Sequence, residues 1–159
     1  MIAPESAEIR LATDERWLRV AMEEAMRATT KGEIPVGAVV VRGDQQIAIG
    51  GNDTIGSSDP SAHAEMLVIR AAAQSLGDWR LTGCTIYITL EPCAMCAGAI
   101  VLSRMHRVVF GAWDDKAGMA GSVGDLLRHP ALNHQPQVQG GVLGAECGAL
   151  LQEFFKSRR

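Results

Sequence analysis

Residues 85–111 read TIYITLEPCAMCAGAIVLSRMHRVVFG, and this stretch contains the unit that decides the fold. Its first five residues are β-branched or aromatic, which favours a strand over 85–89. Pro92 then leads into an apolar run over 93–103 that predicts a helix, and residues 108–111 predict a further strand. A strand, helix and strand in succession predict two parallel strands joined by a right-handed crossover, so we expect an α/β protein.

The start of this helix carries two cysteines, Cys93 and Cys96, whose spacing puts both sulfurs on one side of its first turn. Unpaired N–H groups at a helix start favour the thiolate form of cysteine. Upstream, His63 and Glu65 open another predicted helix over 62–76. Helices that begin at the carboxyl ends of neighbouring strands bring their first turns together, so we expect these residues to meet at one edge of the sheet.

Histidine and cysteine are ligands that zinc prefers, and three protein ligands leave the fourth position of a catalytic zinc open to water. We therefore predict that His63, Cys93 and Cys96 bind zinc. The Glu65 carboxylate is expected to transfer protons beside that water and not to bind the metal. The pattern HxE followed by PCxxC is similar to the signature of zinc-dependent nucleobase deaminases.

Other interpretations of the cysteines stay open. A CxxC pair by itself is also typical of a thioredoxin-like redox pair or of half of a structural zinc site. A structural zinc normally takes four ligands, however, and Cys84 and Cys147 lie in apolar runs where free cysteine behaves as a small hydrophobic residue. The histidine and glutamate upstream favour the catalytic site.

The chain has 159 residues, of which 47% are hydrophobic and 21% are charged, as is usual for a folded domain. We expect one domain over 13–159 after a flexible tail over 1–12. No apolar run reaches the length of a membrane span and the N-terminus lacks a secretory pattern, so we expect a cytoplasmic protein. The net charge of −3 excludes a general nucleic-acid binder, because non-specific affinity needs many Lys and Arg contacts with phosphates. Any nucleic-acid partner must be held locally.

The remaining elements are expected to complete a five-stranded mixed sheet with helices on both faces. They are a helix over 14–31, a hairpin of strands over 36–41 and 46–50, a strand over 138–142 and a closing helix over 145–157. The connection between the hairpin and residue 62 is rich in Gly, Asn, Asp and Ser, which is typical of an irregular segment that carries binding residues.

Over residues 14–159 the chain resembles the bacterial tRNA-specific adenosine deaminases of the cytidine deaminase superfamily. The segments that carry the resemblance are IPVGAVV (34–40), DPSAHAE (59–65), TLEPCAMCAGAI (89–100), RVVFGAWDDKAG (107–118), HPALNH (129–134) and ECGALLQEFF (146–155). HAE with PCxxC is shared by the superfamily, and the segments LEPCAMCAGA, FGAxDxKxG and HPxxNH together point to the tRNA branch. The resemblance implies a three-layer cytidine-deaminase-like fold, one Zn²⁺ per subunit, a homodimer and a tRNA anticodon stem-loop as partner.

By this resemblance the chain is expected to convert adenosine to inosine at the wobble position of a tRNA anticodon. Hydroxide on zinc would attack the purine ring, and Glu65 would pass protons to the ring nitrogen and the departing ammonia. The resemblance also implies that Asn52 and the backbone beside Ala64 and Pro92 contact the flipped purine. Further contacts with anticodon-loop nucleotides would come from Asp114, Lys116, Asn133, Phe155 and Arg158.

Trp113 and Met119 depart from the family pattern, which leads us to expect smaller residues there. They lie next to the segment predicted to face RNA, so they bear on the preference for neighbouring nucleotides and not on the zinc chemistry. Two alternatives share the metal site. One is a deaminase of a free nucleobase or nucleoside such as guanine or cytosine, and the other is a zinc-stabilised binding module without catalysis.

Overall fold

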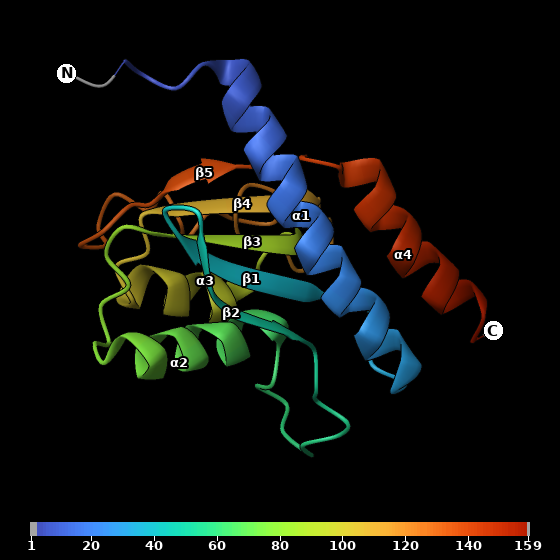
Figure 1. The fold of residues 1–159 in the computed structure, drawn as a ribbon. Coiled ribbons are helices and arrows are strands. Elements are labelled where there is room, and N and C mark those ends of the chain that lie inside the picture. The colour runs from blue at the N-terminus through green and yellow to red at the C-terminus, as the bar shows by residue number, and fades with distance from the viewer. Residues whose placement is uncertain (1–2, 159) are drawn as a thin grey trace.

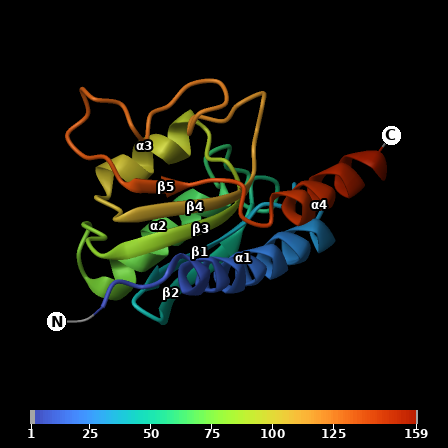
Figure 2. The same cartoon turned by 90° about the horizontal axis from the view of Figure 1, so that it is seen from above.

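The computed structural model describes residues 3–158, in which a five-stranded sheet lies between two pairs of helices (Figure 1). The strands are β1 (Gly37–Arg42), β2 (Gln45–Gly51), β3 (Cys84–Leu90), β4 (Arg107–Ala112) and β5 (Gln137–Gln139). The helices are α1 (Ala7–Thr30), α2 (Ala64–Leu76), α3 (Ala94–Leu102) and α4 (Gly144–Lys156). Helices α1 and α4 cover one face of the sheet and α2 and α3 the other (Figure 2). The predicted mixed sheet with helices on both faces is confirmed.

The strand order β2-β1-β3-β4-β5 brings the carboxyl ends of β2 and β3 to the same edge of the sheet. Strand β1 is antiparallel to both β2 and β3, so these two strands run in the same direction. Strands β3 and β4 are parallel, with Thr85 paired to Arg107 and Leu90 to Ala112, as the crossover predicted. Because α2 follows the end of β2 and α3 follows the end of β3, both helices begin at this edge.

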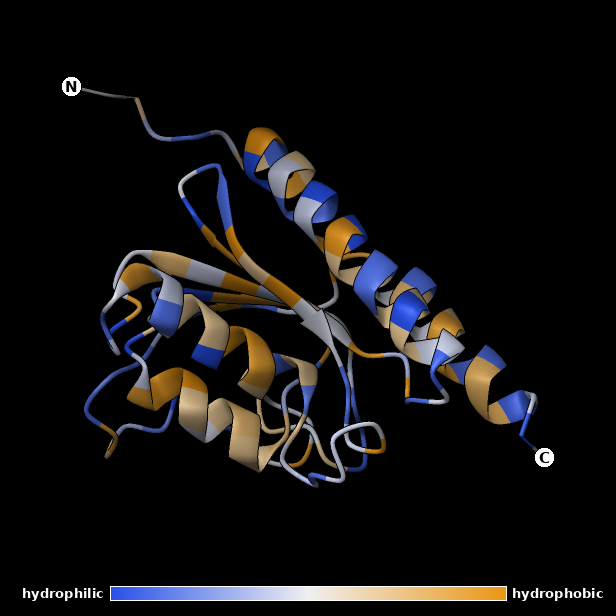
Figure 3. Ribbon diagram, turned by 60° about the horizontal axis from the view of Figure 1, so that its bottom comes forward, coloured by the Kyte–Doolittle hydropathy of each residue, from blue (hydrophilic) through white to orange (hydrophobic). Residues whose placement is uncertain are grey.

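The core lies on both faces of the sheet, which explains the continuous apolar run of β1. Its Val39 and Val41 pack in a cluster with Trp17 and Leu18 of α1, while alternate residues of the strand face the opposite cluster beneath α2 and α3. Alternate side chains of a strand point to opposite faces, so a strand covered on both sides needs apolar residues throughout. Colouring by hydropathy shows α1 as a mixture of hydrophobic and hydrophilic residues, and α2 and α3 as mostly hydrophobic (Figure 3).

Helix α1 corrects the prediction for the N-terminus. It begins at Ala7, where the Ser6 side chain accepts a hydrogen bond of 3.2 Å from the Ile9 N–H, so residues 7–12 are helical and not a tail. Residues 1 and 2 of the predicted tail lie outside the described residues. The pattern of core-facing residues did not reveal this first part, because Ile9 and Leu11 are exposed. The serine cap and good helix formers account for it instead.

A buried ion pair joins α1 to the sheet away from the metal-binding candidates. The Arg107 guanidinium donates two hydrogen bonds to the Asp14 carboxylate, of 2.7 and 2.8 Å, and the Tyr87 hydroxyl donates a third of 3.2 Å. Burial raises the pKa of Tyr87, and the charge of Asp14 adds to this effect, so the phenol stays a hydrogen-bond donor.

From residue 3 to residue 158, every helix is too short or too polar to cross a membrane.

Candidate metal centre and active site

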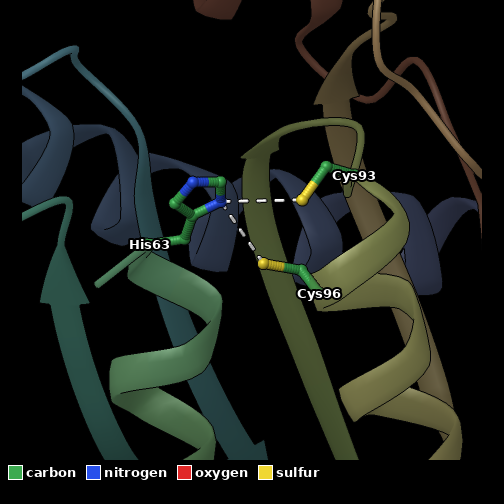
Figure 4. Close-up of side chains that lie close together, drawn as sticks. All are labelled: His63, Cys93 and Cys96. Atoms are coloured by element: carbon green, nitrogen blue, oxygen red, sulfur yellow. Dashed lines mark hydrogen bonds between the residues drawn. The ribbon is translucent and has the colours of Figure 1, made fainter. Parts of the chain in front are cut away.

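The starts of α2 and α3 bring the three predicted zinc ligands together. His63 and Cys93 are the N-cap residues of these helices, both in extended backbone, and Cys96 lies in the first turn of α3. The His63 Nδ1 atom is 3.6 Å from the Cys93 Sγ and 3.5 Å from the Cys96 Sγ (Figure 4). His63 is thus the residue before the first helical residue and does not lie in the first turn as the sequence pattern predicts. The predicted meeting of the two helix starts is confirmed.

The geometry and chemistry of these three residues fit a zinc ion. Their ligand atoms all lie within 4.8 Å of one another. A tetrahedral zinc, with bonds of about 2.0–2.3 Å to nitrogen and sulfur, holds its ligand atoms roughly 3.5 Å apart, close to the distances from Nδ1 to each sulfur. Together His63, Cys93 and Cys96 supply three ligands, which is the number in a catalytic zinc site.

Hydrogen bonds within the cluster favour one thiolate. They lower the pKa of Cys93 to about 3, first through the bond with Cys96 and then through the bond with His63. The same bond with Cys93 raises the pKa of Cys96, and burial adds to the increase. The pKa of His63 is raised mainly by its hydrogen bond with Cys93. Thiolate is the form of cysteine that binds zinc, and the hydrogen bonds of the cluster favour it at Cys93 but not at Cys96.

Glu65 lies in the first turn of α2, with 4% of its surface exposed. Its carboxylate is not among the ligand atoms that cluster at His63, Cys93 and Cys96. Burial raises the pKa of its carboxyl, and the negative charge of Cys93 also raises it, while the charge of His63 acts in the opposite direction. A carboxyl shielded from bulk water beside the metal ligands is suited to general acid and base catalysis.

Asn52 is held against the start of α2. Its Oδ1 atom accepts a hydrogen bond of 2.8 Å from the Ala64 N–H, so its amide NH₂ group is the half of the side chain that can donate to a ligand. Ala64 and Pro92 are both buried. Asn52 also lines a cavity of about 370 Å³ between α1, β2 and α2, with Gly51, Asp53 and Leu67 among its other lining residues. The structure thus places Asn52 and Ala64 together near His63.

Three of the five residues predicted to contact anticodon-loop nucleotides meet at a second cavity. Lys116, Phe155 and Arg158 line this cavity of about 770 Å³ together with Leu151, Gln152 and Lys156. Half of the Phe155 surface is exposed. Neither this cavity nor the one beside Asn52 is lined by the three predicted zinc ligands, so the chemistry of those ligands, and not cavity size, marks the candidate reacting site.

The other two predicted contacts stand apart from this cavity. The Asp114 carboxylate accepts hydrogen bonds from the backbone N–H groups of Lys116 and Ala117, at 3.0 and 3.2 Å, so it shapes its own loop. Asn133 is exposed beside His134, whose Nε2 lies 2.7 Å from the backbone oxygen of Met105. Met105 precedes β4, whereas the metal ligands follow the ends of β2 and β3. Asn133 therefore does not lie beside the metal ligands of its own chain.

Sequence reasoning missed Glu91, which lies between β3 and the metal ligand Cys93 and is 2% exposed. Its carboxylate accepts hydrogen bonds from the backbone N–H groups of Asp114 (2.9 Å), Ala120 (2.9 Å) and Ser122 (3.1 Å), and from the Ser122 hydroxyl. Burial raises the pKa of Glu91, but these hydrogen bonds outweigh it and bring the pKa below its usual value. The signal available was an acidic residue directly after a buried strand.

Glu33 plays a similar part in the loop that follows Asn52, and it too was missed. It is 1% exposed, and its carboxylate accepts hydrogen bonds from the Ile55 N–H (2.8 Å), the Gly56 N–H (2.9 Å) and the Thr54 hydroxyl (3.1 Å). Buried carboxylates are costly unless they are hydrogen-bonded, so both glutamates require their loops to stay in place.

Neighbouring glycines make room for Trp113, one of the two residues expected to differ from the family pattern. Its ring packs edge-on against Phe110 at 4.8 Å between centroids and leaves 52% of the residue exposed. A Cβ atom at Gly140 would lie 2.7 Å from this ring, and one at Gly124 would lie 2.8 Å from the methyl group of Met119. Glycine at these two positions leaves space for the side chains of Trp113 and Met119.

Comparisons with known proteins agree with this site. Residues 11–112 match the model of the cytidine and deoxycytidylate deaminase zinc-binding region. The chain is 49% identical to the tRNA-specific adenosine deaminase of Bacillus subtilis (strain 168), over 94% of this chain and 92% of that protein. It is 46% identical to the tRNA-specific adenosine deaminase of Haemophilus influenzae, over 98% of this chain and 90% of that protein.

Solved structures of both tRNA and guanine deaminases resemble this chain. A structure from a study of A-to-I editing by tRNA:A34 deaminases at the wobble position of transfer RNA superimposes with a TM-score of 0.83 at 40% identity. The superposition covers 86% of this chain and 99% of the other chain. The guanine deaminase of Bacillus subtilis superimposes less well, with a TM-score of 0.62 at 36% identity, over 77% of this chain and 82% of that chain.

Proposed function

The chain belongs to the tRNA-specific adenosine deaminases, a branch of the cytidine and deoxycytidylate deaminase family, and from this premise we propose which of its residues convert adenosine to inosine at the wobble position of a tRNA anticodon. The predicted family and fold class are confirmed. The observation that carries the assignment of residues is the meeting of His63, Cys93 and Cys96 beside a buried Glu65.

In this proposal His63, Cys93 and Cys96 hold one zinc ion per chain. When bound, zinc acts as a Lewis acid that makes a water molecule nucleophilic near neutral pH. Glu65 takes a proton from the attacking water, protonates the purine ring nitrogen, and delivers a proton to the amino group that leaves as ammonia. One water molecule is consumed and inosine and ammonia are formed. Burial of Glu65 excludes bulk water, which keeps these proton transfers between the carboxyl and the substrate.

Asn52 orients the base. Its Oδ1 is occupied by the Ala64 N–H, so its NH₂ group donates to the purine. Because Asn52 and Ala64 are joined, the base is positioned by the same helix start that carries His63. The backbone beside Pro92, next to Cys93, forms the opposite side of the base site in this proposal.

The cavity lined by Lys116, Phe155 and Arg158 receives nucleotides that flank the target. Lysine and arginine side chains there can contact phosphates, and the exposed Phe155 ring can stack on an unpaired base. These charges are local, which suits a chain whose net charge is −3. We propose tRNA as the partner and the cytoplasm as the place of action.

An RNA assay tests this function. We expect the purified protein to form inosine in an anticodon stem-loop with adenosine at the wobble position, and none in a matched stem-loop in which guanosine replaces that adenosine. Free guanine, cytosine and cytidine are the competing substrates. Ammonia release from one of these, with no inosine in the RNA, would assign the chain to the nucleobase or nucleoside deaminases instead.

We also propose a homodimer, and helix α3 supports it. This helix is apolar around most of its circumference, and such helices are normally covered on all sides. Its outer face carries Ala94, Met95, Gly98 and Leu102, with 69% of Leu102 exposed. Since α3 begins at the metal ligands, a partner on this face would border the reacting site.

Sedimentation tests the homodimer. The unaltered protein is expected to have twice the mass of one chain, and the Leu102→Asp variant is expected to have the mass of one chain, 17.0 kDa. A single-chain mass for the unaltered protein would contradict the proposal.

A further inference from the structure

We propose that Glu91 is a positioning residue for the RNA substrate: it fastens the loop of residues 113–124, named here the 113–124 loop, to the turn that carries Cys93. This inference rests on the proposed function, because its consequence concerns how RNA is held. It assigns Glu91 no part in the chemical step.

The contacts of Glu91 close the 113–124 loop around its carboxylate. One oxygen, Oε1, accepts from the Asp114 N–H and the Ser122 hydroxyl, and the other, Oε2, accepts from the N–H groups of Ala120 and Ser122. The loop also makes room for the carboxylate, since a Cβ atom at Gly118 would lie 2.3 Å from the Glu91 Oε1. Residues from the beginning, the middle and the end of the loop thus depend on one side chain.

Backbone hydrogen bonds beside the carboxylate strengthen the same connection. The Glu91 N–H donates to the Ala112 oxygen at 2.8 Å, and the Met119 N–H donates to the Pro92 oxygen at 2.8 Å. Pro92 is followed directly by Cys93. The loop and the metal-binding turn are therefore held in one geometry, and the carboxylate supplies the contacts that span the loop.

The 113–124 loop carries Lys116, which lines the cavity with Phe155 and Arg158. Asp114 stands at the base of the loop and turns it by accepting from the Lys116 N–H. If the loop is released from Glu91, Lys116 no longer has a defined place relative to α4 or to the metal ligands. RNA binding should weaken, while the metal ligands and Glu65 keep their own contacts on α2 and α3.

A glutamine at this position cannot replace the carboxylate. Both carboxylate oxygens accept backbone N–H groups, so either orientation of a glutamine amide turns its NH₂ group toward an N–H donor. Buried donors left unsatisfied in this way are expected to open the loop. Glu91→Gln thus changes few atoms and tests the hydrogen bonds directly.

Hydrogen exchange tests the attachment independently of activity. In Glu91→Gln, amide exchange in the 113–124 loop is expected to accelerate by roughly tenfold or more, since a hydrogen bond to a buried charged group is lost, while exchange in α2 stays unchanged. Glu33→Gln is the matched control, because it removes the same charge from a buried glutamate that holds residues 54–56. It should accelerate exchange there and leave the 113–124 loop unchanged. Unchanged exchange in this loop for Glu91→Gln would overturn the proposal.

Steady-state kinetics on the anticodon stem-loop test the consequence. For Glu91→Gln we expect KM to rise by roughly tenfold with kcat within about threefold of the unaltered enzyme, and zinc content to be unchanged. A fall in kcat at unchanged KM would show a role in the chemical step and overturn the proposal.

Gly118→Ala is a second variant, because its methyl group would occupy the place of the Glu91 carboxylate. It should also raise KM and leave kcat nearly unchanged. If the unaltered protein leaves the stem-loop unmodified, the proposed function fails, while the exchange experiment still decides whether Glu91 holds the loop.

Discussion

Glu65→Gln is expected to lower kcat for inosine formation by roughly 10²–10⁴-fold, the usual contribution of a general acid and base. Glutamine keeps the size of the side chain but cannot accept the proton of the attacking water or return it to the leaving amino group. Because Glu65 lies outside the cluster of metal ligands, zinc content and the folded structure should remain nearly unchanged. The measurements are inosine formed in the stem-loop, zinc bound per chain, and the midpoint of thermal unfolding.

Glu146→Gln is the matched control for this variant. Glu146 is also an acidic residue in the first turn of a helix, but it is exposed on α4. Its substitution should leave kcat unchanged. If Glu65→Gln keeps its activity, Glu65 is not the group that transfers protons. The zinc site would then have no residue assigned as its general acid and base. Loss of zinc together with activity would instead indicate that Glu65 supports the metal.

Cys96→Ala is expected to abolish activity through loss of the metal. Cys96 is fully buried and supplies one of three ligands. Mutation of residues that merely orient a metal ligand lowers metal affinity by roughly 10–100-fold, so removal of a ligand itself should lower it by more than about a hundredfold. Zinc titration measures this change. Added zinc should also raise the thermal midpoint of the unaltered protein more than that of the variant, because ligand binding stabilises the folded state.

Cys84→Ala serves as the control, since Cys84 is also fully buried but lies in β3 away from the ligand cluster. It should lose some stability from the small cavity created, and it should keep its zinc affinity. This pair of variants also decides between the metal site and the redox alternative. A Cys96→Ala protein that binds zinc as before would contradict the role of Cys96 as a ligand. An untreated protein without metal and with a reversible disulfide between Cys93 and Cys96 would favour the redox pair.

The local sequence was sufficient to predict the centre of the molecule. The unit from β3 to β4 follows from a β-branched strand, a proline at the turn and an apolar helix, features that lie within a few residues of each other. Short motifs, HxE and PCxxC, were enough to predict His63 and Cys93 as ligands. Each motif lies at the start of a helix that follows the end of a strand. The direction of those strands then brought the motifs together, as expected for an open α/β sheet.

The sequence pattern misplaced or missed features whose partners are distant along the chain. It predicted a tail where α1 begins, because the exposed Ile9 and Leu11 do not follow the core-facing periodicity. The family resemblance, and not the pattern, placed Asn133 among the RNA contacts, and this stays a prediction; the structure shows only that its loop lies away from the metal ligands of the same chain. A residue's place in a loop depends on contacts that periodicity does not encode.

By itself, the sequence determined the family, the α/β fold and the identity of the four residues that we assign to metal binding and proton transfer, since these are written in short motifs and regular periods. Only the tertiary structure decided that Glu33 and Glu91 hold the two loops beside the site and that Lys116 shares a cavity with α4. The physical reason is that a buried carboxylate is satisfied by backbone N–H groups that are 22 to 31 residues away. Any residue type except proline can supply such a donor, so the pairing leaves no mark in the amino-acid pattern.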